Sequence, residues 1–471
     1  MGESGQRNTK ESLSKGNQKM NDEKATKING ITEGVIWKQL LLFFFPILLG
    51  SLFQQFYNAV DAIVVGRFVG KEALSSVGGS TATLINLLIG FFLGLSAGSS
   101  VCISQYYGAK KEQEVSDSVH TAMAMAVAGG AVLMVLGLLF TKQALIWTGV
   151  PKEIFDYSRQ YMLIYFAGVI PNLVYNMGAG ILRAVGDSKR PLYYLVASCL
   201  LNIVLDLFFV VGLHLEIIGV AVATVISQLV SAILVCAALM RSEDCYRLSW
   251  KKVRFHRYYL DKMIKIGLPG GLQSIMYTLS NIIIQAQINS FGTDTIAAWT
   301  VYGKIDSFFW VTVAAFGTAI TTFNGQNYGA GKMSRVRKAT RQCMAMTVSA
   351  TVLLSLVLYY GAAPIYEIFT SDADVITIGL DMMHYLVPVY VTYISVEVLS
   401  GALRGMGNVI VPTIMTLVGV CGLRLLWLFT VVPVHHELHT LMFSYPLTWV
   451  VASLGFIFYY GHVKRKMPKE L

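Results

Sequence analysis

The sequence predicts an all-α integral membrane protein with about twelve transmembrane helices in two six-helix lobes related by pseudo-two-fold symmetry. Three observations lead to this fold class. Of the 471 residues, 55% are hydrophobic and only 14% are charged, whereas soluble globular proteins carry about 25% charged residues. Apolar runs of about twenty residues, long enough to cross a bilayer as helices, recur along the chain. Two sequence motifs also repeat in a common register.

The apolar runs define the expected helices in chain order, by length and composition. In the first half they cover 38–66, 77–103, 120–142, 159–182, 192–213 and 217–241. In the second half they cover 263–290, 296–323, 341–363, 377–402, 409–432 and 438–462. The expected organisation is therefore a disordered polar tail (1–36), a first lobe (37–241), a basic linker (242–262), a second lobe (263–463) and a short cytoplasmic tail (464–471).

The repeat fixes the relation between the two halves. The segment SQYYGAKK (Ser104–Lys111) recurs as GQNYGAGK (Gly325–Lys332), and LRAVGDSKRP (Leu182–Pro191) recurs as LRGMGNVIVP (Leu403–Pro412). Position 104 corresponds to 325 and position 191 to 412, so both matches share one offset. Because each half holds six spans, both insert with the same orientation about an axis along the membrane normal. This is the plan of a transporter with a cavity between its lobes.

The net charge is +10, and the placement of the charged residues along the chain indicates the membrane topology. Loops rich in acid or histidine alternate with loops rich in lysine and arginine, which is the positive-inside pattern. Both termini are therefore expected in the cytoplasm, and no nucleic-acid partner is expected. The basic loops are Lys110–Lys111, Arg183–Arg190, Arg241–Lys265, Lys332–Arg341 and Lys464–Lys469.

An unpaired acid lies in the first apolar run. The stretch QQFYNAVDAIVVG (54–66) contains Asp61 but no lysine, arginine or histidine. An embedded charge costs about 2.5–3.5 kcal/mol even on insertion scales, and such residues are functional by default. Gln54, Asn58 and Asp61 are spaced i, i+4, i+7 and share a helix face, with Tyr57 at its edge. Pro46 lacks a backbone N–H, which predicts a kink earlier in this helix.

Further embedded polar residues are candidates for the same site or for a second one. Asn202 and Asp206 are spaced i, i+4 on the fifth run, and two acids with a carboxamide suit a cation or a shared proton. A hydrogen-bonded structural network is the alternative interpretation of these groups. Glu397 and Arg424, on the tenth and eleventh runs, are weaker candidates, either as an ion pair with each other or in transport.

Enzyme motifs fail on inspection, so neither an enzyme nor a cofactor is expected. The segment GQNYGAGKMS is not a phosphate loop, because Gln326 replaces the first glycine and Met333 follows the lysine. The segment HHELHT lacks the second histidine of a zinc protease, since Thr440 takes its place. No catalytic triad or dyad is apparent. The only metal ion expected is Na⁺ as a coupling ion.

With these residues identified, the chain resembles the multidrug and toxic compound extrusion (MATE) family from Trp37 to Lys464. The resemblance rests on Pro46 with YNAVDAIVVG, the paired Gln-x-x-Gly turns, LRAVGD and its repeat LRGMGN, and NIVLD followed by IGVAVAT. It implies a multi-pass transporter of the cell membrane that exports amphipathic, often cationic, compounds against inward H⁺ or Na⁺. A monomer is adequate for this plan. The alternative function is a flippase of similar architecture for lipids or lipid-linked oligosaccharides.

The resemblance also implies a coupling site. In the DinF-like branch of the family, the first-lobe cation site corresponds to Asp61, Asn202, Asp206 and Thr224 here. The resemblance further implies that Pro46 supports bending of the first helix. The acid of the seventh span that other branches carry is missing, and Glu397 does not fall where those branches place their tenth-span acid. A second-lobe coupling site is therefore not expected from the resemblance.

Overall fold

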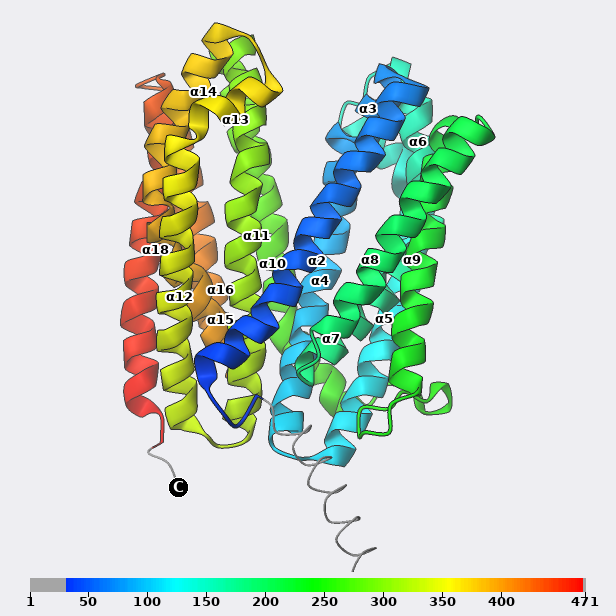
Figure 1. Ribbon diagram of the computed structural model, residues 1–471, viewed down its shortest axis with the longest axis vertical. Helices are drawn as coiled ribbons and strands as arrows, with labels where there is room; N and C mark the ends of the chain where they lie inside the picture. The colour runs from blue at the N-terminus through cyan, green and yellow to red at the C-terminus, as the bar shows by residue number, and fades with distance from the viewer. Residues whose placement is uncertain (1–30, 469–471) are drawn as a thin grey trace, which may run out of the picture.

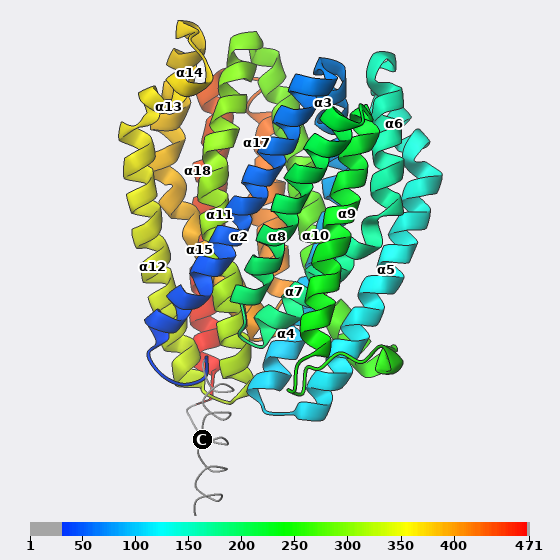
Figure 2. The ribbon, with the colours of Figure 1, turned by 45° about the vertical axis from the view of Figure 1, so that its right-hand side comes forward.

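The computed structural model describes residues 31–468, and every regular element in that range is a helix (Figures 1 and 2). Two groups of helices correspond to the expected lobes. The first contains α2 (Ile36–Val64), η1 (Val65–Val69), α3 (Lys71–Val77), α4 (Gly79–Gly108), α5 (Glu112–Trp147), α6 (Lys152–Ala167), α7 (Val169–Ala184), α8 (Lys189–Asp206), η2 (Leu207–Gly212) and α9 (Glu216–Met240).

The second group follows a connection that contains η3 (Trp250–Lys252). It comprises α10 (Arg257–Ile288), η4 (Asn289–Phe291), α11 (Thr293–Gly329), α12 (Met333–Tyr360), α13 (Ala362–Phe369), α14 (Ala373–Leu386), η5 (Val387–Tyr393), α15 (Ile394–Gly405), α16 (Ile410–Thr416), η6 (Leu417–Gly422), α17 (Leu423–Thr430) and α18 (Leu438–Lys466). The helix α10 begins inside the stretch expected as linker, because its first turn is polar and extends beyond the apolar run that defined the span.

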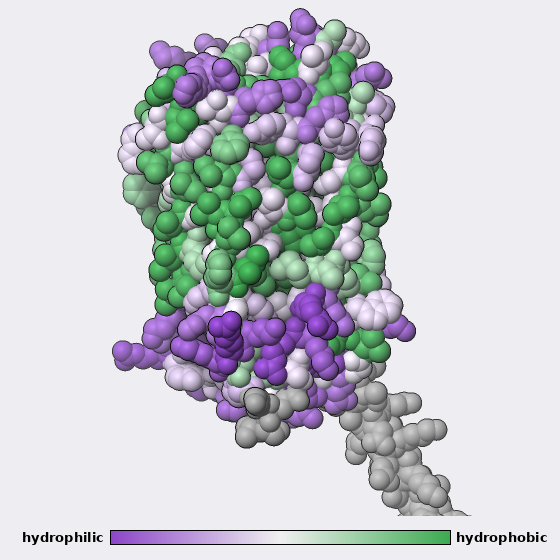
Figure 3. Space-filling model, turned by 90° about the vertical axis from the view of Figure 1, so that its left-hand side faces the viewer, coloured by the Kyte–Doolittle hydropathy of each residue, from purple (hydrophilic) through white to green (hydrophobic). Residues whose placement is uncertain are grey.

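The membrane-spanning character is confirmed. Within residues 31–468, ten helices are long and apolar enough to cross a bilayer, and the bent pair α6–α7 raises the number to eleven. The helix α10 covers the remaining expected span but carries more polar side chains. Figure 3 shows the corresponding apolar band between two hydrophilic ends. The lysine- and arginine-rich turns between α4 and α5 and between α11 and α12 lie at one of these ends, called here the basic end (Figure 1).

The expected span 159–182 is bent by 52° between α6 and α7. Two residues account for the bend. Pro171 has no backbone N–H, so the carbonyl of Ala167 loses its helical donor. Gly168 packs closely on α9, where an added Cβ would lie 2.4 Å from a methyl group of Val225. A glycine is needed at this turn because a larger side chain would not fit between the two helices.

The lobes meet along α4 and α10. Where α4 and α10 come closest to each other, their backbones are in contact, since a Cβ added to Gly94 would lie 2.2 Å from the backbone nitrogen of Gly271. Small residues allow this approach of helices in membranes. Toward the basic end, α4 also packs against α11. Figure 1 shows the two groups of helices diverging toward the opposite end.

At the basic end, the two repeated glutamines make reciprocal hydrogen bonds between the lobes. Gln105 at the end of α4 donates to the carbonyl of Gly405 at the end of α15 (2.9 Å). Gln326 at the end of α11 donates to the carbonyl of Ala184 at the end of α7 (2.7 Å). All four groups are buried. The repeat in the sequence is therefore a structural symmetry at this junction.

The helix α2 contacts both lobes. Its first turns pack in the core of the second lobe, where Leu40 is buried and the ring of Phe44 stacks on that of Phe316 with 3.9 Å between centroids. Its middle faces α8 of the first lobe, where Gly50 lies against Leu192 and Leu195. The helix remains continuous through Pro46.

The short segment before α2 is held by the second lobe. Arg335 donates to the carbonyls of Ile31 (3.1 Å), Glu33 (2.7 Å) and Gly34 (2.7 Å), and Lys332 donates to that of Thr32 (3.0 Å). The expected disordered tail was 1–36. Its last residues are thus ordered, and positions 1–30 lie outside the described residues.

Candidate functional site

Asp61, Asn202 and Asp206 come together in the first lobe. With its amide nitrogen facing the acids, Asn202 donates to Asp61 Oδ1 (2.8 Å) and to Asp206 Oδ2 (3.2 Å). The acids are close enough to share a hydrogen bond when one is protonated. All three side chains are buried. Asp206 Oδ1 has no hydrogen-bond donor among the described residues. Two buried acids with an unsatisfied oxygen need a proton or a cation.

Both acids lie where an α-helix changes to a π-helix. Asp206 is the last residue of α8 before η2, and Asp61 precedes η1 by one helical turn. A π-helical turn changes the backbone hydrogen-bond partners and often occurs at functional sites. The carboxylates therefore lie beside backbone whose hydrogen-bond pattern departs from that of a regular α-helix.

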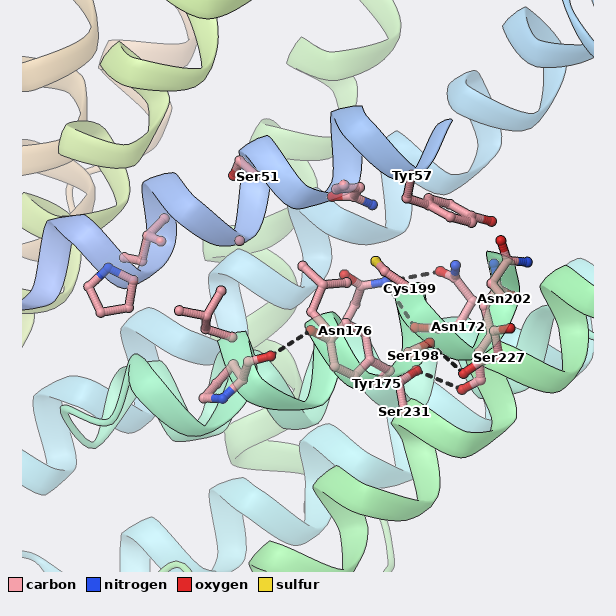
Figure 4. Close-up of a pocket in the computed structure, with 18 of the residues that line it drawn as sticks. Ser51, Tyr57, Asn172, Tyr175, Asn176, Ser198, Cys199, Asn202, Ser227 and Ser231 are labelled. Carbon is pink, nitrogen blue, oxygen red and sulfur yellow. Dashed lines mark hydrogen bonds between the residues drawn. The ribbon is translucent and has the colours of Figure 1, made fainter. Parts of the chain in front are cut away.

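A polar cavity of about 160 Å³ leads to this group between α2, α7, α8 and α9 (Figure 4). Gln54, Tyr57 and Thr224 line it together with Asn202, and Pro46 contributes to its wall. The Tyr57 hydroxyl lies 3.5 Å from that of Thr224, which donates to the Val220 carbonyl (3.0 Å). Figure 4 labels further lining side chains: Ser51, Asn172, Tyr175, Asn176, Ser198, Cys199, Ser227 and Ser231.

The polar stripe expected on α2 is only partly directed toward this cavity. Gln54 and Tyr57 line it, and Asp61 reaches the same group through Asn202. Asn58 is exposed and is not among the lining residues. The i, i+4, i+7 spacing identified a polar face but not which of its side chains turn into the first lobe.

Glu397 and Arg424 do not pair with each other, which corrects that part of the sequence interpretation. Among residues 31–468 no ion pair joins them. Arg424 donates to Thr448 (3.2 Å) and lies over the ring of Tyr445 at 4.1 Å. Glu397 has Tyr393 and Arg404 as polar neighbours. The two side chains therefore have different neighbours. Their positions in the sequence do not reveal this, because it depends on how the helices pack.

Sequence reasoning missed Asp306 in α11. Its carboxylate accepts hydrogen bonds from Trp310 Nε1 (2.6 Å), from the Tyr390 hydroxyl (2.7 Å) and, at 3.4 Å, from the Tyr302 hydroxyl. All three donors are neutral. The signal was present, because Tyr302, Asp306 and Trp310 are spaced i, i+4, i+8 and therefore share one face of an apolar span. No cluster of three acid, histidine or cysteine side chains suited to a metal occurs in the described range.

The MatE family model matches residues 46–208 and 269–430, more than half of the chain. The chain belongs to the MatE family. Members of this family are membrane transporters and not enzymes. The two matched segments correspond to the two lobes, and they begin at Pro46 and Pro269, the prolines inside α2 and α10.

Relatives agree with this assignment, and a solved structure has the same fold. The probable multidrug resistance protein YoeA of Bacillus subtilis is 27% identical over 443 residues, which cover 92% of this chain and 95% of that protein. A FAD transporter of Shewanella oneidensis is 23% identical over 74% of this chain and 77% of its own length. A structure described as the outward-facing conformation of a multidrug resistance MATE family transporter superimposes with a TM-score of 0.87. The superposition covers 94% of this chain and 98% of the chain in that structure. The sequence identity is 20%, so the match supports the fold alone.

Proposed function

We propose that this MatE protein is a secondary active multidrug transporter. It exports amphipathic, often cationic, compounds in exchange for inward H⁺ or Na⁺ by alternating access between two lobes. Relatives named as multidrug resistance or multidrug export proteins support the substrate class. The observation that carries the coupling is the buried Asp61–Asn202–Asp206 group with its unsatisfied carboxylate oxygen.

The proposed coupling follows from charge. With both acids ionised, the group attracts either a substrate cation in the adjoining cavity or the coupling ion. A proton shared between Asp61 and Asp206, or Na⁺ held by their oxygens with those of Asn202 and Thr224, neutralises it. The ion then drives the change of state only through its different affinity for the two conformations. The π-helical turns after the two acids are the elements that would respond.

The proposed orientation follows the charges of the loops. The basic end faces the cytoplasm, in agreement with the positive-inside rule. The two ends of the described chain, before α2 and after α18, lie at this end (Figure 1). Both termini are accordingly cytoplasmic, the protein resides in the cell membrane, and a monomer contains the complete site.

A flippase for lipid-linked oligosaccharides remains the second candidate. It would gather several cationic side chains in one central cavity to hold a pyrophosphate. Arg183 and Arg424 do line cavities, but different ones, in the first and second lobes. Each of these two cavities is lined by a single arginine, so drug efflux is the better supported function.

The decisive experiment measures dye efflux from proteoliposomes under an imposed pH or Na⁺ gradient. Wild type is expected to transport a cationic dye only when a gradient is imposed. The Asp61→Asn variant is expected to lose this gradient-driven efflux while retaining its fold. Asp156→Asn is the matched control, because it replaces an exposed acid at the end of the first lobe. Normal gradient-driven efflux by Asp61→Asn would refute the coupling role. Absence of efflux in wild type would favour the flippase.

A further inference from the structure

A second cavity lies in the second lobe, away from the Asp61–Asn202–Asp206 group. Its volume is about 520 Å³, within the range of pockets for drug-sized ligands. Residues of α10, α11, η5, η6, α17 and α18 form its wall. Seven aromatic side chains dominate the lining: Tyr277, Trp299, Tyr302, Trp310, Tyr393, Tyr445 and Trp449. Such a wall favours a flat aromatic ligand, because rings gain from offset stacking and edge contacts.

Two opposite charges also line this cavity, Asp306 and Arg424. They form no ion pair with each other or with any other described side chain. The partners of Asp306 are the neutral donors Tyr302, Trp310 and Tyr390. The partners of Arg424 are the hydroxyl of Thr448 and the ring of Tyr445. Each charge is therefore held in place by neutral groups and lacks a counter-charge in direct contact.

This arrangement has a chemical consequence. A ligand with only a positive group would be attracted by Asp306 and repelled by Arg424. A ligand with only a negative group would be repelled by Asp306 and attracted by Arg424. A ligand that carries both charges satisfies both residues at once. Charge-assisted hydrogen bonds are about twice as strong as neutral ones, so both ends of such a ligand would add to its affinity.

We propose that this second-lobe cavity binds planar aromatic compounds bearing both a protonated amine and a carboxylate. The amine lies toward Asp306, the carboxylate toward Arg424, and the ring against the tryptophans and tyrosines. The inference rests on the proposed function and extends it, since it adds a substrate site that is separate from the coupling group of the first lobe.

One residue of the wall allows the cavity to be filled without disturbing its chemistry. Gly303 lies on α11, one turn before the acid, and a Cβ built there would meet no atom within 4 Å. Gly303→Leu should therefore occupy space that the ligand needs while leaving Asp306 and Arg424 in place. Leucine also favours helix over glycine, so this substitution is not expected to destabilise α11.

The test is equilibrium binding to the purified full-length protein in lipid nanodiscs, with three matched probes. The first is an aminomethyl naphthoic acid, which carries both charges. The second is its methyl ester, which keeps only the ammonium, and the third is its N-acetyl derivative, which keeps only the carboxylate. Each lost charge-assisted hydrogen bond should weaken binding by about tenfold or more. Equal affinity for all three probes would overturn the proposal.

Substitutions assign each charge to its partner. Asp306→Asn should abolish the preference for the probe with both charges over its N-acetyl derivative. Arg424→Gln should abolish the preference for the probe with both charges over its methyl ester. A structural role would instead weaken all three probes equally. Gly303→Leu should weaken every probe, and Asp294→Asn, which changes an exposed acid on the same helix, should change nothing. Unaltered binding in Gly303→Leu would place the ligand elsewhere and refute the site.

The two proposals fail independently. Binding of the three probes is measured at equilibrium without any gradient, so it does not depend on coupling at Asp61. Gradient-driven dye efflux together with equal binding of the three probes would refute only the second-lobe site. Selective binding of the zwitterionic probe without any efflux would refute only the proposed transport function.

Discussion

The reciprocal glutamines at the basic end yield a quantitative prediction. Gln326→Ala removes the donor to the Ala184 carbonyl, which is buried and at present accepts a 2.7 Å hydrogen bond from the other lobe. Leaving such a group unsatisfied costs about 1–3 kcal/mol. The cost falls on the conformation in which the basic ends are in contact, because the bond exists only there. Since 1.4 kcal/mol is a tenfold change, the ratio of open to closed basic ends should rise by roughly 5- to 150-fold.

The second half of the prediction comes from symmetry. Gln105 makes the equivalent bond to Gly405 at 2.9 Å, so Gln105→Ala should shift the equilibrium in the same direction and by a similar factor. The double substitution should open the basic end further than either single one. Its effect need not be the product of the two, because neighbouring residues are rarely independent.

The assay is the distribution of distances between two spin labels at the basic end. The cysteines that carry them are introduced at Lys110, in the turn between α4 and α5, and at Lys338, near the start of α12. Five of the six native cysteines are buried, so only Cys245 requires replacement. The control is Gln113→Ala, an exposed glutamine at the same end whose amide bonds Asp117 on its own helix (3.0 Å). An unchanged distance distribution in Gln326→Ala, with a lowered Tm, would show that the glutamine supports the fold and not one conformation.

Three further predictions follow from single contacts. Gly329→Ala would place a Cβ 1.9 Å from the carbonyl oxygen of Gln105, so the same spin-label assay should show the basic ends forced apart; an unchanged distribution would mean that the backbone there adapts. Trp310→Phe leaves an oxygen of Asp306 without its 2.6 Å donor and should lower the free energy of unfolding by about 1–3 kcal/mol, measured by thermal unfolding against Trp250→Phe, an exposed tryptophan; equal Tm values would contradict the role of this bond. Arg335→Ala removes the donor to the carbonyls before α2 and should speed amide exchange there, whereas Lys338→Ala should not; slow exchange in both variants would show that other contacts hold the segment.

Much of the fold could be predicted because membrane helices are encoded locally. Run length and the polar loops located the spans, and the repeated motifs around Gln105 and Gln326 revealed the two equivalent halves. The first-lobe group could also be predicted from the sequence. The i, i+4 spacing of Asn202 and Asp206 places them on one helix face, and Asp61 has no basic partner in the stretch 54–66 of its own span. These inferences need only the periodicity of a helix and the cost of an embedded charge.

The remainder depends on how the helices pack. The reciprocal bonds of Gln105 and Gln326 exist only when the lobes are docked, so the sequence showed the repeat but not its contacts. Whether Glu397 and Arg424 meet depends on the rotation of their helices, and they do not meet. Asp306 is a different case, because its i, i+4 spacing from Trp310 places both residues on one helix face and makes it recognisable from the sequence.

The prolines at the start of the two matched segments lie in helices that cross the boundary between the lobes. The first turns of α2 pack in the second lobe, and α10 packs chiefly along α4 of the first. Each half thus lends its first helix to the other, as in a domain-swapped dimer. A half-length protein of this design would be incomplete as a single chain and would fold fully only by exchanging that helix with a second copy. Joining two copies in one chain makes the exchange intramolecular, so that assembly no longer depends on protein concentration.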